Sequence, residues 1–380
     1  MPRTHPRNWH AVRSTGRGAG MYFSASEQKL AFLMQGDRDN YLLNLHRFIH
    51  VAVTYPRKSL VSLSETPYYH VVARCVRRAW LWGFDAYAGR DYSHRKQWVL
   101  DRLAQLASVF TIDVCAYAIM SNHYHLVLHV DRDRAQRLST EEVVERWTRL
   151  FREPEIVKRW RTGNASEEER GIAETIIEKW RNRLYDLSWF MKCMNEYLAR
   201  RANAEDGCDG RFWHGRFKSQ ALLDVEGLLT AMAYVDLNPV RAGVAVTPET
   251  SEYTSVYERI KAIRGQGASR HISRVPLLPF RAANAAQSRP SIPFELPEYL
   301  QLVDWTGRVI RQDKRGYIDR SLPAIMCRLQ IDPTEWRQTM RPRGNVFGRA
   351  IGRLSRLRIH ASALGQHWIS GLRVAQRLYA

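Results

Sequence analysis

The chain of 380 residues is long enough for two or three domains that each bury a full hydrophobic core. A formal net charge of +20 favours a polyanionic partner, most simply a nucleic acid. No apolar run approaches the ~20 residues of a membrane-spanning helix and no signal peptide is recognisable, so we expect a cytoplasmic protein with no membrane partner.

The N-terminal stretch is basic and poor in core-forming residues. Residues 1–20 contain four arginines, no acidic residue and few large apolar residues, a composition typical of disorder. Residues 21–54 contain one stretch of helical character, for which the sequence offers no partner. We therefore expect residues 1–54 to form a poorly ordered basic extension.

The next segments predict an α+β core. Residues 68–76 alternate between faces and are rich in β-forming side chains, and so are residues 113–121 and 123–130. Residues 91–109 between them show the apolar spacing of a helix. The order strand, helix, strand, strand is typical of ferredoxin-like folds. We therefore expect an antiparallel sheet with helices packed mainly on one face.

Helices dominate the prediction for the second half of the chain. Residues 140–151 and 184–203 have helical apolar spacing, and the highly charged stretch 152–183 fits a helical insertion. That insertion is explained equally well as a solvated surface or as a binding surface. Prolines and small residues predict a linker over 251–297, followed by a basic helical region over 298–380.

A glycine-rich loop combines cationic and aromatic side chains. Arg211, Arg216 and Lys218 surround Trp213 in this loop. On single-stranded nucleic acids, cations hold phosphates while aromatic rings stack on bases. Plain packing of the ring is the alternative, and the sequence leaves both readings open. In the first reading these four residues bind DNA, together with Arg241 farther along the chain.

Two histidines lie close together on one predicted strand. His123 and His125 are two residues apart, and because a strand has a side-chain period of two, both project from one face. Two adjacent imidazoles can hold one divalent metal ion. The alternative is a pair of polar side chains on the solvated face of a half-buried strand. His70, on an earlier strand, is interpreted as a packing residue.

A later helix carries a second pair of candidate residues. Asp224 predicts the N-cap of this helix, and Pro239 predicts that it ends near Asn238. Tyr234 and Asn238 are four residues apart and therefore share one helix face. A tyrosine beside a metal site can act as a nucleophile, whereas a packed tyrosine followed by a capping asparagine is the structural alternative.

Together these motifs resemble those of the single-tyrosine HUH transposases, and most closely the branch of REP-associated tyrosine transposases. The resemblance covers roughly residues 56–250, and we expect residues 55–250 to form the catalytic domain. Two positions depart from the family pattern: Tyr124 replaces an aliphatic residue, and His214 stands where an acidic or amide residue is usual. Four segments carry the resemblance, in this order: Tyr69–Arg74, Ser121–His125, Gly210–Ser219 and Tyr234–Gly243.

The resemblance implies a specific chemistry. Mg²⁺ or Mn²⁺ would be held by His123, His125 and Asn238, and Tyr234 would attack a phosphodiester of single-stranded DNA to form a 5′-phosphotyrosine. The DNA can contain a hairpin, the protein would act as a monomer or homodimer, and no small-molecule cofactor is implied. The base that accepts the tyrosine proton is not identified.

Two other functions stay open at this point. The chain can be a domesticated DNA-binding protein without catalysis, or an RNA-binding or RNA-processing protein, because basic and aromatic surfaces serve both nucleic acids. Rival nucleophiles are also open. The strand period turns Tyr124 away from the histidines, whereas Tyr117 shares their face only if the strand is unbroken, and Tyr197 lies on a separate helix.

Overall fold

Three strands of the central sheet form at residues 68–74, 112–119 and 123–130, which are rich in β-branched and aromatic residues, and one strand joins the sheet from the far end of the chain. The computed structural model describes residues 61–76, 83–85, 89–263, 275–281, 290–310, 335 and 348–379. The sheet has the order β4-β5-β1-β6-β7, and a separate ribbon pairs β2 with β3. The strands are β1 (Tyr68–Arg74), β2 (Phe84–Asp85), β3 (Arg90–Asp91), β4 (Ile112–Ile119), β5 (His123–Val130), β6 (Lys218–Leu222) and β7 (Ala350–Ile351).

The prediction of an antiparallel sheet is correct for four of these strands and wrong for the fifth. β4, β5, β1 and β6 pair antiparallel, whereas β7 pairs parallel to β6, which makes the sheet mixed. A tight hairpin would have forced β7 to run antiparallel. The chain instead returns to this edge from a distant segment, so either direction is sterically possible.

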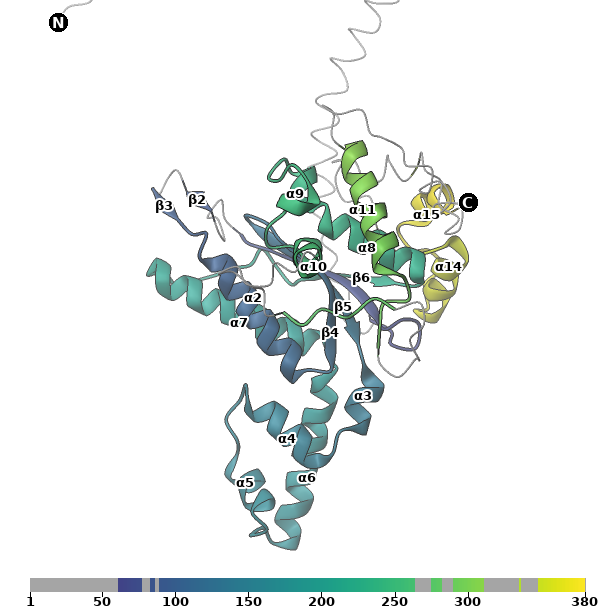
Figure 1. Cartoon of the computed structure of the whole chain (residues 1–380). Helices are drawn as coiled ribbons and strands as arrows, with labels where there is room; N and C mark the ends of the chain where they lie inside the picture. The colour runs from purple at the N-terminus through teal and green to yellow at the C-terminus, as the bar shows by residue number, and fades with distance from the viewer. Residues whose placement is uncertain are drawn as a thin grey trace, which may run out of the picture. The chain divides into compact units, whose positions relative to one another are not determined.

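The helices cover both faces of the sheet, not mainly one as predicted (Figure 1). On one face, the hydroxyl of Tyr124 donates to Asn195 of α7 at 2.5 Å. On the other face, the ring of His125 lies 5.9 Å from the ring of Tyr234 in α8. Because neighbouring strand residues point to opposite faces, α7 and α8 must lie on opposite sides of β5. The main helices are α2 (Arg95–Val109), α7 (Leu187–Asp206) and α8 (Val225–Asp236).

The charged insertion is helical, as the sequence predicts. Ser139 caps α4 and forms a capping box with Glu142. Trp147 of α4 stacks on Trp180 of α6 with ring centroids 5.7 Å apart. The insertion contains α5 (Glu155–Arg161) and α6 (Glu167–Leu184), and it follows α3 (Arg132–Arg137) and α4 (Thr140–Thr148).

The stretch predicted as a linker contributes to the core wherever the structure describes it. Val256 of α10 is fully buried, and Leu278 donates its backbone N–H to the carbonyl of Val114 at 2.8 Å. The proline content suggested a linker, but the described residues of this stretch pack because they include buried apolar side chains. The remaining elements are α9 (Asn238–Arg241), η2 (Pro248–Thr250), α10 (Ser255–Ile263), α11 (Leu296–Ile310), α14 (Leu354–Ala363) and α15 (Leu372–Leu378).

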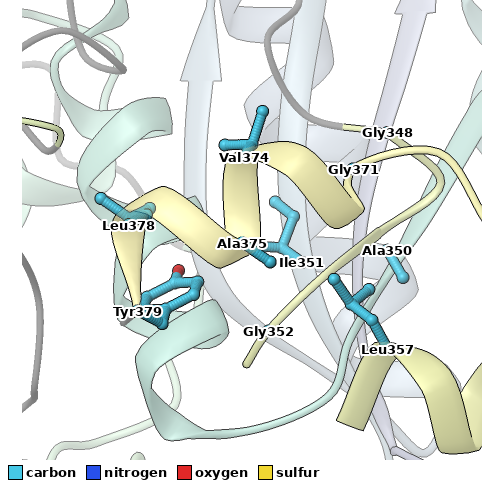
Figure 2. A pocket seen from close by; sticks show the side chains of 10 residues that line it. All are labelled: Gly348, Ala350, Ile351, Gly352, Leu357, Gly371, Val374, Ala375, Leu378 and Tyr379. Atoms are coloured by element: carbon cyan, nitrogen blue, oxygen red, sulfur yellow. The ribbon is translucent and has the colours of Figure 1, made fainter. Parts of the chain in front are cut away.

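The C-terminal region packs against β6 and α8. Figure 2 shows Tyr379 beside Leu378 and Ala375 at a small pocket that α15 forms with the residues around β7. The hydroxyls of Tyr379 and Thr230 lie 2.7 Å apart, which ties the end of the chain to α8. This region therefore supports the helix that carries the second candidate pair.

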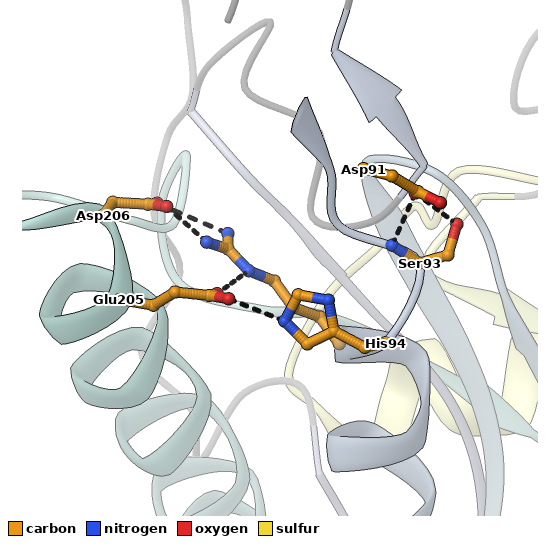
Figure 3. A network of polar contacts seen from close by, with 6 residues as sticks. Asp91, Ser93, His94, Glu205 and Asp206 are labelled. Atoms are coloured by element: carbon orange, nitrogen blue, oxygen red, sulfur yellow. Dashed lines mark hydrogen bonds and ion pairs between the residues drawn. The ribbon is translucent and has the colours of Figure 1, made fainter. Parts of the chain in front are cut away.

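A buried arginine joins the two helices behind the sheet. Arg95, at the start of α2, is 2% exposed and contacts Glu205 and Asp206 at the end of α7. His94 approaches the same Glu205 at 2.7 Å, and Figure 3 shows the carboxylates converging on this point. Separating α2 from α7 would leave the charge of Arg95 buried without its partners, which is costly. The network therefore holds the two helices in a defined register.

Two expectations concern the parts of the chain outside the sheet. The predicted N-terminal extension, residues 1–54, lies outside the described residues. Within the parts that the structure does describe, no helix is both long enough and apolar enough to cross a membrane.

Candidate active site

The sheet places the two histidines of β5 beside β1. His123 is paired with Arg74, and His125 is paired with Val72, so all four side chains lie on one face. His125 is 5% exposed, whereas His123 lies nearer the open end of the strand and is half-buried. The strand period therefore creates a buried imidazole and a more accessible one on a common face.

The helix face of Tyr234 and Asn238 meets this sheet face. Asp224 caps α8 by accepting the backbone N–H of Gly227 at 2.7 Å, which confirms the predicted cap. The helix ends at Asp236, and the short α9 begins at Asn238. The side-chain nitrogen of Asn238 lies 3.2 Å from Nε2 of His125. Residues that are 113 positions apart therefore share one site.

The tyrosine ring lies among the histidines and a guanidinium. The centroid of the Tyr234 ring is 5.9 Å from that of His125 and 6.2 Å from that of His70. The guanidinium carbon of Arg241 lies 4.1 Å from the Tyr234 centroid, over the ring face. Such cation–π contacts fix ring orientation and add positive potential beside the phenol oxygen.

Burial keeps the site's imidazoles uncharged. It lowers the pKa of His70 and of His123 to about 4, and it lowers the pKa of His125 well below the ordinary value. Desolvation of the charged ring is the main cause in each case, and the positive charge of Arg74 adds a smaller repulsion at His123 and His125. Near neutral pH each ring therefore carries a lone pair that a metal or a donor can use.

The donor set fits a divalent ion. Nδ1 of His123 lies 2.7 Å from the side-chain oxygen of Asn122, which only accepts, so Nδ1 carries the hydrogen and Nε2 the lone pair. Nε2 of His125 lies 3.2 Å from the side-chain nitrogen of Asn238. Two ligands of one metal ion are also about 3 Å apart. Asn238 would present its oxygen to the ion. Mg²⁺ prefers oxygen ligands, so of the two predicted ions Mn²⁺ suits this nitrogen-rich set better.

The set contains only two residues of the types that usually build metal sites. Within the described residues, no group of three or more His, Cys, Asp or Glu side chains is arranged to hold a metal ion. The predicted third ligand, Asn238, is an amide and is outside that group of residue types. The metal thus stays a prediction that depends on the amide oxygen.

Sequence reasoning missed two buried residues of the site. His70, interpreted as packing, lies edge to edge with His125: the ring centroids are 5.2 Å apart, the planes are inclined by 7°, and the facing nitrogens are 2.9 Å apart. Gln220, which the sequence did not single out, contacts His70 at 2.6 Å from β6. The parity of His70 on a predicted strand was a usable signal. Gln220 gave none, because Lys218–Leu222 lacks the alternation typical of a strand.

Cationic side chains surround the open end of the histidine face. Arg74, a further residue that sequence reasoning did not assign, is exposed and paired with His123. Lys218 is exposed and paired with Val72, so it lies on the same face. Positive charges at such a rim favour an approaching phosphate.

The loop residues predicted to bind DNA differ in their surroundings. Arg211 and Arg216 are exposed, and Nε of Arg211 donates to the carbonyl of Trp213 at 3.1 Å. Trp213 is half-buried, donates its indole N–H to the carbonyl of Asn195 at 2.8 Å, and lies 5.8 Å from the ring of Tyr124. These contacts favour the packing interpretation of Trp213, while the two arginines are available to solvent.

The rival tyrosines lie away from the histidine face. Tyr124 and Tyr117 are both fully buried, and the register after the β4–β5 turn pairs Tyr117 with Leu126, so Tyr117 lies on the face opposite His125. Tyr197 belongs to α7 on that same opposite side, where its hydroxyl accepts from Arg201 at 2.6 Å. Of the four candidates only Tyr234 contacts the histidines.

Comparison with known proteins adds little to this geometry. No protein-family model and no curated protein matches the chain. One solved structure, described as a REP-associated tyrosine transposase bound to a REP hairpin, is similar at 9% identity and a TM-score of 0.32, over 61% of this chain and 94% of the other. A likeness at that TM-score is too weak to assign a fold or an activity to this chain.

Proposed function

We propose that this chain is a metal-dependent DNA nickase and strand transferase that acts on single-stranded DNA through Tyr234. The proposal is supported by one juxtaposition: Tyr234 and Asn238 lie against the buried His125, which is 113 residues from Asn238 in the chain. A purely structural tyrosine and a capping asparagine do not require two desolvated imidazoles beside them. A metal-assisted site of tyrosine attack on a phosphodiester places the nucleophile next to ligands with free lone pairs, and neutral imidazoles supply these.

The proposed reaction conserves bond energy. The oxygen of Tyr234 forms a bond to the phosphorus, and the bond from phosphorus to the 3′ oxygen breaks. The phenol proton leaves to solvent or a base, and the departing 3′ oxygen gains a proton. Attack of a 3′-hydroxyl on the phosphotyrosine reverses these changes and joins a new strand, so no ATP is needed.

His123, His125 and Asn238 would hold Mg²⁺ or Mn²⁺ in this enzyme. The bound ion would polarise the scissile phosphate and stabilise negative charge on its oxygens. The protein residues keep both rings neutral, exclude water from His125, and hold the phenol next to the ligands. Arg241, over the Tyr234 ring, stabilises the negative charge that develops on the phenol oxygen.

The substrate is proposed to be single-stranded DNA that can carry a hairpin. Arg74 and Lys218 supply cations at the open end of the histidine face, and the exposed Arg211 and Arg216 belong to the neighbouring loop, in which His214 donates its backbone N–H to the carbonyl of Arg74. These contacts are to the backbone and select charge, not sequence. The protein would act as a monomer or homodimer.

Trapping of the covalent product tests the proposal. Wild-type protein with Mn²⁺ or Mg²⁺ is mixed with single-stranded oligonucleotides, with and without hairpins, and the adducts are resolved under denaturing conditions and mapped by mass spectrometry. We expect a phosphotyrosine at Tyr234 that disappears in Tyr234→Phe and persists in the matched control Tyr197→Phe. An adduct on Tyr117, Tyr124 or Tyr197 would overturn the assignment.

The same assay separates the other two functions. Tight DNA binding without any adduct, with either metal, indicates a non-catalytic DNA-binding protein. Preferential binding or cleavage of RNA oligonucleotides of the same sequences indicates an RNA-processing protein. Either result rejects the proposed strand transferase.

A further inference from the structure

A buried line of three polar side chains leads from β6 to the candidate metal ligand. Oε1 of Gln220 lies 2.6 Å from Nδ1 of His70, and Nε2 of His70 lies 2.9 Å from Nδ1 of His125. Gln220, His70 and His125 are 6%, 4% and 5% exposed. Polar groups this deep are costly unless each is hydrogen-bonded, so this line has defined donors and acceptors.

The orientation of Gln220 is determined by the C-terminal region. Its side-chain nitrogen donates to the carbonyl oxygen of Gly348, and a carbonyl can only accept. Gly348 is closely packed, because an added Cβ there would come within 2.0 Å of the carbonyl oxygen of Ser370. Figure 2 shows Gly348 next to Gly371 at the start of the segment that contains β7. The amide oxygen of Gln220 is therefore left facing His70.

That orientation determines the hydrogen positions along the line. The oxygen of Gln220 only accepts, so Nδ1 of His70 carries a hydrogen. In the neutral ring, Nε2 of His70 is then an acceptor. The 2.9 Å contact needs one hydrogen, which must come from Nδ1 of His125. Nε2 of His125 is consequently left with its lone pair, on the side where Asn238 lies.

We propose that Gln220 and His70 are positioning residues that hold His125 in the Nδ1–H tautomer, with Nε2 ready to bind a metal ion. This inference rests on the proposed function. It explains how His125, which is only 5% exposed, is held ready to bind the metal ion. Partners of this kind fix the tautomer and ring orientation of metal-bound histidines in general. Here the partner is a second imidazole, whose own tautomer depends on a residue from the C-terminal region.

Nitrogen NMR of the metal-free protein tests the tautomer directly. With ¹⁵N-labelled histidine, long-range correlations distinguish a protonated ring nitrogen from one with a lone pair. The 13 histidines are assigned by comparison with His70→Gln and His125→Gln. We expect His70 and His125 of the wild-type protein both to carry the hydrogen on Nδ1. A hydrogen on Nε2 of His125 in the wild-type protein would overturn the inference; the two variants serve only to assign the signals.

A pair of variants tests the role of Gln220. Gln220→Met removes the acceptor at similar volume, whereas the protonated carboxyl of Gln220→Glu keeps both an oxygen facing His70 and a donor to the carbonyl of Gly348. We expect Gln220→Met to mix the His125 tautomers and to weaken Mn²⁺ binding by roughly 10-fold or more, and Gln220→Glu to restore both. His129, whose Nδ1 lies 3.1 Å from Asp113, is the internal control that should not change. An unchanged His125 tautomer and Mn²⁺ affinity in Gln220→Met would overturn the inference.

The two proposals fail in different ways. If the tautomers respond to Gln220 as expected but no phosphotyrosine forms on any DNA, the proposed function is wrong and the positioning line stands. If the adduct forms at Tyr234 while the His125 tautomer is insensitive to Gln220, the enzyme stands and the positioning line is wrong.

Discussion

Truncation of Trp213 distinguishes base stacking from packing, the two interpretations that the sequence left open. Complete burial would make a Trp-to-Ala change cost about 3–5 kcal/mol. Trp213 is half-buried, so we expect about 2 kcal/mol from lost packing against Tyr124 and Phe212, with ring centroids at 5.8 and 5.0 Å. Its indole N–H bond to the carbonyl of Asn195 adds about 1 kcal/mol.

The expected total of about 3 kcal/mol for Trp213→Ala is measurable in two ways. Chemical denaturation should give a lower free energy of unfolding, and the melting temperature should fall by roughly 6–12 °C for a domain of this size. Trp213→Phe, which keeps a ring but loses the N–H donor, should lose only about 1 kcal/mol.

DNA binding provides the opposing test. If Trp213 mainly stacks on a base, Trp213→Ala should reduce single-stranded DNA affinity by about 1–3 kcal/mol while the melting temperature stays within about 2 °C of the wild type. That outcome would refute the packing argument. Fluorescence anisotropy with a labelled oligonucleotide, performed well below the melting temperature of the variant, measures the affinity.

Three further predictions follow from the contacts and pKa shifts of the site. Folding lowers the pKa of His70 and His123 from 6.5 to about 4, so the unfolded chain binds more protons than the folded protein between these pH values. The free energy of unfolding should therefore decrease as pH falls through this window. Denaturation measured at each pH should show this decrease, and a smaller one in His70→Gln. Asp224→Ala should lower stability by about 1–3 kcal/mol in urea titrations, because it removes the α8 cap and leaves the backbone N–H of Arg353 without its acceptor at 2.7 Å. DNA affinity should fall with salt, and if Arg216 contacts a phosphate, Arg216→Ala should reduce the log–log slope by about 0.7; an unchanged slope would exclude that contact.

Local patterns in the sequence were sufficient for the parts of the site that depend on one element. The period of two on β5 places His123 and His125 on one face, and this depends only on the strand being extended. The spacing of four keeps Tyr234 and Asn238 together on one side of the α8–α9 segment, and Asp224 marks its start. These periodicities belong to the backbone geometry itself, so they can be read without a partner element.

Only the tertiary structure decided what meets across elements. α8 lies on the histidine face and α7 on the other, although the sequence predicted helices mainly on one face, because the apolar side chains of both helices fit a sheet that is buried on both sides. Residues 251–297 show the same limit: Val256 and Leu278 are core residues, despite the prolines that suggested a linker. Proline content suggests a flexible segment, whereas burial depends on whether the rest of the fold offers an apolar surface to pack against.

The line from Gln220 to His125 is the clearest case of a site that only the fold assembles. Its contacts join residues 150 and 55 positions apart in the chain. β6 has little strand character of its own and becomes a strand because β1 and β7 supply its hydrogen bonds. The sequence by itself therefore determined that two imidazoles would share a strand face. The long-range register determined which nitrogen of His125 faces Asn238, because a tautomer depends on hydrogen-bond partners that no local pattern contains.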